Sequence, residues 1–148
     1  MIIVYDDPGL STKNITIWDG FQFFGFGASD NFTVTNLLTP ASGAFQTQAG
    51  YFGFDGESSS TGDFVNINGS ALSNALNPSN NTLNGTISEF GVDVGGRNPN
   101  FNYSWAVDSD VFDATGLVPN SATSANITLG SSSEGIWGGV FVISNVIA

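Results

Sequence analysis

Two clusters of carboxylates are the side chains in this sequence best suited to chemistry. Asp55, Glu57 and Asp63 form the first cluster, and the second lies within residues 108–113. Calcium takes several oxygen ligands from flexible segments, and neither cluster matches the EF-hand pattern of a sixth-position glycine and a closing glutamate. We favour the second cluster as a calcium site, and the alternative is that both are solvated charges and turn caps. The predicted calcium ligands are Asp108, Asp110 and Asp113.

Asn-x-Ser/Thr sequences are the most specific local motif in the chain. They mark possible acceptors of N-linked glycans in a secreted protein. Several lie at strand starts or beside turns, where a glycan would point outward, and we expect glycosylation. The alternative is chance, because the chain is rich in Asn, Ser and Thr. The predicted acceptors are Asn14, Asn31, Asn68, Asn80, Asn84, Asn102 and Asn126.

The composition excludes several functional classes. The chain of 148 residues carries 13 acidic residues and 2 basic ones, for a net charge of -11, so it cannot build the basic patch that binds nucleic acid. It has no histidine and no cysteine, which removes the usual ligands of zinc and haem and every imidazole base. A carboxylate pair of the glycosidase type needs a fixed separation that a sequence does not reveal. We expect no enzymatic activity and no cofactor other than calcium.

The two basic residues and the aromatic side chains have structural roles in our interpretation. We expect Arg97 to pair with a carboxylate, for which its guanidinium fork is suited, rather than to contact a ligand. Most aromatic residues should lie in the core, although an exposed row could stack on sugars or bind a neighbouring subunit. The aromatic residues considered are Trp18, Phe21, Phe23, Phe24, Phe26, Tyr103 and Trp105.

Short runs of β-branched and aromatic residues, separated by Gly, Asn, Asp, Ser and Pro, indicate an all-β fold. We predict a single domain over residues 1–148, an antiparallel β-sandwich or jelly roll. Asn68 followed by Gly69 predicts a hairpin, residues 44–54 a strand bulged at Gly50 or Gly53, and residues 70–76 a short helical turn. The other predicted strands are residues 1–5, 14–18, 31–35, 63–67, 125–129 and 137–147.

Targeting and membrane signals are weak in this sequence. No run reaches the roughly 18 apolar residues needed to span a bilayer, so we expect no membrane span. Residues 1–5 are apolar but have neither a basic leader nor a cleavage site, and are not expected to be a signal peptide.

A series of short motifs in a fixed order carries a family resemblance over most of the chain. The sequence resembles an uncharacterised β-rich domain of large secreted, adhesin-like surface proteins of bacteria and archaea. That resemblance implies a surface location and a non-enzymatic role. The motifs lie at residues 2–8, 17–21, 62–63, 68–69, 77–78, 97–100 and 107–110.

Two functional hypotheses follow. The first is an extracellular structural protein, a glycosylated subunit of a surface filament, pilus or surface layer that forms a homopolymer. Strands at residues 1–5 and 140–147 would join its copies by strand donation, unless they pair within their own sheet. The alternative is a carbohydrate-binding adhesin module that uses exposed aromatic residues and calcium.

Overall fold

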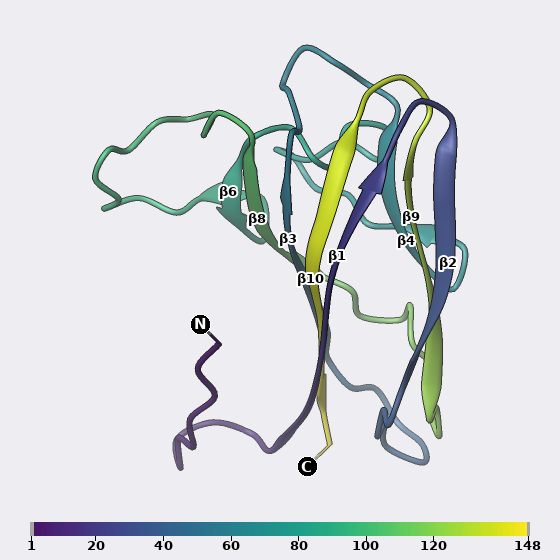
Figure 1. The fold of residues 1–148 in the computed structure, drawn as a ribbon. Coiled ribbons are helices and arrows are strands. Elements are labelled where there is room, and N and C mark those ends of the chain that lie inside the picture. Colours follow the sequence, from purple (N-terminus) through teal and green to yellow (C-terminus); the bar gives the residue numbers. More distant parts are fainter. Residues whose placement is uncertain (1, 148) are drawn as a thin grey trace.

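The computed structural model describes residues 2–147, and within them it contains strands and no helix. Figure 1 shows the strands arranged in two sheets that face each other. The first sheet has the order β1 (Lys13–Phe24), β10 (Ile136–Val146), β3 (Thr47–Phe54), β8 (Val107–Asp113), β6 (Ile87–Glu89) and β7 (Val92–Asp93). The second has the order β2 (Ala28–Thr35), β9 (Ser124–Ser131), β4 (Asp63–Ile67) and β5 (Ser70–Ala71).

The all-β sandwich prediction is confirmed, with one correction to its strand pairing. The pairs are antiparallel except for β6 and β8, which run parallel, so the first sheet is mixed. The chain leaves β6 through the short β7 and returns to β8 by a long loop, which permits the parallel pair.

The core lies between the two sheets and is built from alternate positions of their strands. Phe141 and Ile143 of β10 point inward, and Ile127 of β9 meets them from the second sheet. Because neighbouring side chains on a strand point to opposite faces, each buried residue has an outward neighbour. The other buried apolar residues of the strands include Phe24, Val34, Ala49, Tyr51, Val65, Ile67, Phe112, Ala125 and Ile136.

The predicted hairpin is present, and the predicted bulge lies on other strands. β4 and β5 pair across Asn68 and Gly69, whose φ angles of 51° and 82° are those the tight turn requires. Residues 70–76 therefore begin as a strand and form no helical turn. The register of the first sheet shifts at two places. Between β1 and β10 it shifts between Asp19 and Gln22, and between β10 and β3 it shifts between residues 138 and 140.

The segments expected to join copies of the chain behave differently from each other. β10 lies in the middle of its sheet, paired with β1 on one side and β3 on the other. Residues 2–12 form no strand, and their apolar side chains at positions 2–5 are exposed; Met1 lies outside the described residues. Figure 1 shows this segment outside the two sheets. In the described residues no helix is long and apolar enough to cross a membrane.

Candidate functional site

Five aromatic side chains gather on the outer face of the first sheet, a group we call the aromatic platform. It comprises Phe21 and Phe23 from β1, Phe52 and Phe54 from β3, and Trp137 from the strand between them, β10. Phe23, Trp137 and Phe54 are direct neighbours across the three strands. The three strands lie side by side in Figure 1.

The platform rings contact one another and remain accessible. Phe21 stacks on Trp137 with ring centroids 4.7 Å apart and planes inclined by 16°. Phe23 lies 4.9 Å from the same indole, and Phe52 meets Phe54 edge-on at 4.9 Å. Phe21, Phe23 and Phe52 expose 65%, 52% and 36% of their surface, so the packed rings still offer an apolar area to solvent.

The β-bulge decides which face of the sheet carries Trp137. Phe141 and Ile143 point inward, and strict alternation would send Trp137 inward with them. On β10, Gly138 pairs with Gly53 and Val140 with Phe52, so Gly139 is an extra residue without a partner in β3, and it reverses the alternation along β10. Ile136 is consequently buried, and Trp137 faces outward.

Glycine is required at the bulge because the chains approach closely there. A Cβ atom on Gly139 would lie 2.9 Å from the carbonyl oxygen of Phe52 and 3.3 Å from its ring. A Cβ on Gly138 would lie 2.6 Å from the Leu129 side chain of the other sheet. Beside the bulge, a partly open pocket of about 180 Å³ lies between the sheets, and its lining includes the exposed residue Asp19. Gly138 and Gly139 therefore allow β10 to pack closely against Phe52 of β3 and against Leu129 of the second sheet.

Charge near the platform is negative. Asp19 lies on β1 two residues before Phe21 and is exposed. Lys13 is ten residues from Phe23 along the same strand, a separation of about 33 Å at the usual rise. The other basic residue, Arg97, is paired with Asp93. The platform thus lacks a free cation, and its neighbourhood repels anions.

A second set of exposed aromatic residues lies on residues 94–106, which we call the tip loop. Phe101, Tyr103 and Trp105 are exposed there, the last by 95%. The prediction that most of the aromatic residues considered are core residues is wrong, because Phe24 alone among them is buried. Phe21, Phe23, Phe26, Tyr103 and Trp105 are exposed, and Trp18 packs partly against the core.

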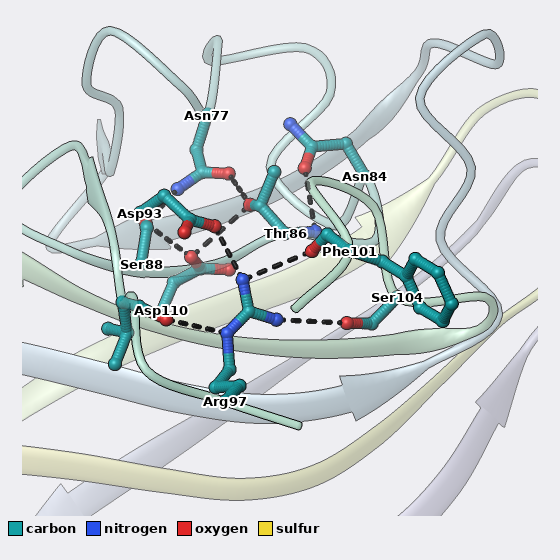
Figure 2. Close-up of polar contacts among 10 residues, drawn as sticks. Asn77, Asn84, Thr86, Ser88, Asp93, Arg97, Phe101, Ser104 and Asp110 are labelled. Atoms are coloured by element: carbon teal, nitrogen blue, oxygen red, sulfur yellow. Dashed lines mark hydrogen bonds and ion pairs between the residues drawn. The ribbon is translucent and has the colours of Figure 1, made fainter. Parts of the chain in front are cut away.

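Arg97 holds the tip loop together, as Figure 2 shows. Its guanidinium contacts Asp93 Oδ1 at 2.5 Å and donates to the Phe101 carbonyl at 3.1 Å and to Ser104 Oγ at 3.2 Å. Its Nε donates to the Val94 carbonyl at 2.6 Å. The predicted structural ion pair is confirmed, and it connects the two ends of this loop.

The three predicted calcium ligands do not form one site. Asp108 and Asp110 are buried on the inner face of β8, whereas Asp113 is exposed and accepts the backbone N–H of Thr115 at 2.9 Å. Alternation along the strand separates them, because positions 108 and 110 share the inward face whereas position 113 lies on the outward face, where β8 ends and Asp113 caps a turn. In residues 2–147 no three side chains of His, Cys, Asp or Glu are already placed to hold a metal ion.

The two buried aspartates instead hold residues 81–86, a buried segment without strand partners. Asp108 Oδ1 accepts the N–H groups of Asn84 and Gly85, each at 2.7 Å. Asp110 accepts hydroxyl donors, including Thr86 in Figure 2 and Tyr51 at 3.0 Å. Burial raises the pKa of Asp108 to about 7 and also raises that of Asp110. These carboxyls therefore serve as internal acceptors for a loop.

The predicted glycan acceptors differ in their accessibility. Asn84 is buried, and its Nδ2 donates to the carbonyls of Leu76 and Asn81, so a glycan on that atom is incompatible with this fold. Asn14 is half-buried, and its side chain contacts the backbone near residues 36–38. The exposed acceptors are Asn31, Asn68, Asn80, Asn102 and Asn126.

Solved structures of other proteins contain a similar fold. No family model and no curated protein matches the sequence. A β-porphyranase of glycoside hydrolase family 86 from the human gut bacterium Bacteroides plebeius is similar over 92% of this chain and 21% of its own, with 18% identity and a TM-score of 0.51. BuGH86, solved with neoagarooctaose, is similar over 92% of this chain and 19% of its own, with 12% identity and a TM-score of 0.50. The chain thus spans about a fifth of those proteins, and the likeness concerns the sandwich fold.

Proposed function

We propose that this sandwich is a non-catalytic domain that binds neutral polysaccharides through the aromatic platform. The observation that carries the proposal is the group of five contacting rings on three paired strands, of which Phe21, Phe23 and Phe52 are exposed and the other two half-buried. Pyranose rings have apolar C–H faces that pack on aromatic rings, and contiguous exposed apolar surfaces mark interaction sites. Because the strands hold the rings in place, little conformational entropy is lost when a sugar chain settles on them.

The charge of the chain supports a neutral ligand. Its net charge is -11, Asp19 adjoins the platform, and Lys13 lies at the far end of β1. A sulfated or carboxylated glycan would be repelled and would find no basic partner. The solved neighbours support a carbohydrate context, since one is a β-porphyranase and another was solved with neoagarooctaose. An extracellular location, where polysaccharides are met, belongs to the same proposal.

The filament hypothesis receives less support from the fold. β10 pairs on both sides within its own sheet, so donating residues 140–147 to another copy would remove the middle of that sheet. Residues 2–5 are unpaired, but they form no strand in the described structure. The test of the proposal below therefore includes a measurement of self-association.

Affinity electrophoresis in gels containing agarose tests the proposal, with neoagaro-oligosaccharide titration by calorimetry as a second readout. We expect the chain to be retarded, and Trp137→Ala to weaken binding by about tenfold or more, equivalent to about 1.4 kcal/mol. Trp105→Ala is the matched control, because it removes an exposed indole outside the platform. Analytical ultracentrifugation of each variant reports folding and self-association.

A panel of further neutral polysaccharides, with sulfated counterparts, extends the same test. We expect sulfated chains to bind more weakly than neutral ones at low salt, with the difference shrinking as salt is added. Failure of the folded chain to bind any neutral polysaccharide would contradict the proposal. So would concentration-dependent polymers that Trp137→Ala dissolves.

A further inference from the structure

Two buried carboxyl groups, Asp63 and Glu134, face each other at the end of the sandwich where β10 begins. Asp63 opens β4 and pairs with Ser131 of β9, and the Ser131 hydroxyl accepts the N–H of Glu134 at 3.1 Å. Asp63 is fully buried and Glu134 is 6% exposed. Their carboxyl groups lie within hydrogen-bonding reach of each other.

Most of the oxygens of this pair have no partner. Asp63 Oδ1 accepts the N–H of Leu83 at 2.5 Å, but apart from the facing carboxyl of the pair, no donor group serves Asp63 Oδ2 or the two carboxyl oxygens of Glu134. Buried carboxylates are stable only when they are paired with a cation, hydrogen-bonded or protonated. Asn81 Oδ1 and Asp108 Oδ2 also lack a donor, but among the buried acids of the described residues Glu134 alone has both carboxyl oxygens without one.

The chain offers the pair no cation of its own. Its two basic residues are Lys13 and Arg97, and Arg97 is engaged by Asp93. Glu134 precedes Ile136, which pairs with Phe24, whereas Lys13 pairs with Val146 ten positions along the sheet. At the usual rise per residue this places Lys13 about 33 Å from the end that holds the acid pair. With both carboxyl groups ionised, the countercharge has to come from solution.

Further oxygen donors adjoin the pair on residues 55–62. Glu57 and the hydroxyl of Ser60 lie near Glu134, and that hydroxyl donates to Glu57 Oε2 at 3.0 Å. Glu57 is exposed and stands on a loop. The neighbourhood thus supplies carboxylate and hydroxyl oxygens, the ligands of hard cations, and neither nitrogen nor sulfur side chains of the kind that zinc prefers.

We propose that Asp63 and Glu134 bind a calcium ion, with Glu57 moving in to complete the site. As the structure stands, the pair supplies two carboxylates, and the third must come from the exposed loop. Calcium suits this set better than magnesium, because it accepts irregular geometry and a bidentate carboxylate, for which both oxygens of Glu134 are free. The ion would fasten residues 55–62 to the turn that enters β10, three residues before Trp137.

Calorimetric titration of the chelator-treated full chain with CaCl2, and thermal unfolding in CaCl2 or MgCl2, test the site at pH 8.5. At 100-fold excess over its Kd, calcium is expected to raise Tm by about 5–10 °C. Glu134→Gln and Asp63→Asn are expected to abolish the heat of binding and the Tm shift. Glu57→Gln is expected to weaken calcium binding by about tenfold. Asp113→Asn, which removes an exposed carboxylate elsewhere, should bind calcium as the parent chain does.

Two results would overturn the site. One is a folded parent chain that shows neither heat nor Tm shift with CaCl2 at pH 8.5, which would mean that the pair holds a proton instead. The other is an unchanged calcium affinity in Glu57→Gln, an exposed position where folding is not at risk. The test is independent of glycan binding, because it uses the metal alone.

Discussion

The aromatic platform and the tip loop both expose aromatic rings, but they hold them by different means. The platform rings stand on β1, β10 and β3 and contact one another, with Trp137 touching two of them. The tip loop holds Phe101, Tyr103 and Trp105 on irregular backbone, organised by the contacts of Arg97. Exposure alone therefore does not distinguish the two regions.

The difference between the regions lies in how much order exists before a ligand arrives. Fixing one mobile side chain on binding costs about 0.5–1.5 kcal/mol. Rings that already stack across paired strands avoid much of that cost, whereas a ring such as Trp105, 95% exposed, must be immobilised by its ligand. A sugar chain should consequently prefer the platform, although the loop also exposes aromatic rings.

The largest expected effect comes from breaking the platform at its bulge. In Gly139→Ala the new methyl would press on the backbone and ring of Phe52, 2.9 Å and 3.3 Å away. We expect a loss of about 1–3 kcal/mol in unfolding free energy and of about tenfold or more in glycan affinity. Urea unfolding and affinity electrophoresis measure the two effects.

Gly95→Ala is the control, because a Cβ there meets nothing within 4 Å and the residue belongs to the tip loop. It should change stability by less than about 0.5 kcal/mol and leave glycan affinity unaltered. Equal losses in the two variants would remove the distinction between platform and loop.

The second effect concerns the pH dependence of stability and arises from Asp108 of β8. The pKa of Asp108 is about 7 in the folded state, above its usual value near 3.9, because the group is buried. The folded state thus binds more protons than the unfolded state between about pH 4 and 7. Stability should fall as pH rises through that window, by up to about 1.4 kcal/mol per pH unit for this group.

Asp108→Asn separates this group from the other buried acids. Asparagine keeps an oxygen for the N–H groups of Asn84 and Gly85 and carries no charge. Thermal unfolding from pH 4 to 8 should show a shallower decline in Tm for the variant than for the parent. An identical decline in both would show that Asp108 titrates normally.

The smallest expected effect is the loss of stability when Arg97, which organises the tip loop, is replaced. Arg97→Ala removes the contacts to Asp93, Phe101 and Ser104 and should cost about 1 kcal/mol, because the ion pair is only partly buried. Hydrogen exchange should accelerate within residues 94–106 and stay unchanged in β10. Weaker binding of agarose by Arg97→Ala would indicate that the loop takes part in the site.

The sequence pattern predicted the strands that alternate clearly and the hairpin at Asn68 and Gly69. Residues 14–18 and 125–129 lie within β1 and β9. In β9 the alternation places Ala125 and Ile127 in the core, whereas residues 14–18 lie on the edge strand β1 and contain no fully buried side chain. β8 was not predicted as a strand, because its inward positions include Asp108 and Asp110. Carboxylates usually lie at solvent-exposed positions, and nothing local in the sequence shows that residues 81–86 would cover these two aspartates.

Two platform residues, Phe21 and Phe23, were predicted to lie in the core for a related reason. Aromatic residues are usually buried, and the side of a strand on which a ring lies depends on the register beyond any bulge. The available signal was the pair Gly138 and Gly139 inside an apolar strand, since glycine there often marks a bulge. A bulge on β10 alone reverses the side of Trp137, and the sequence does not show which of several glycines will form it.

The central place of β10 has a consequence for how the molecule is made. β1 and β3 have no partner in the first sheet on their shared side until residues 136–146 have left the ribosome, because β10 fills the gap between them. Until then a nascent chain presents two open strand edges and the rings of Phe21, Phe23 and Phe52. Synthesis that stalls before residue 136 should therefore yield sticky, chaperone-dependent fragments rather than a smaller working domain.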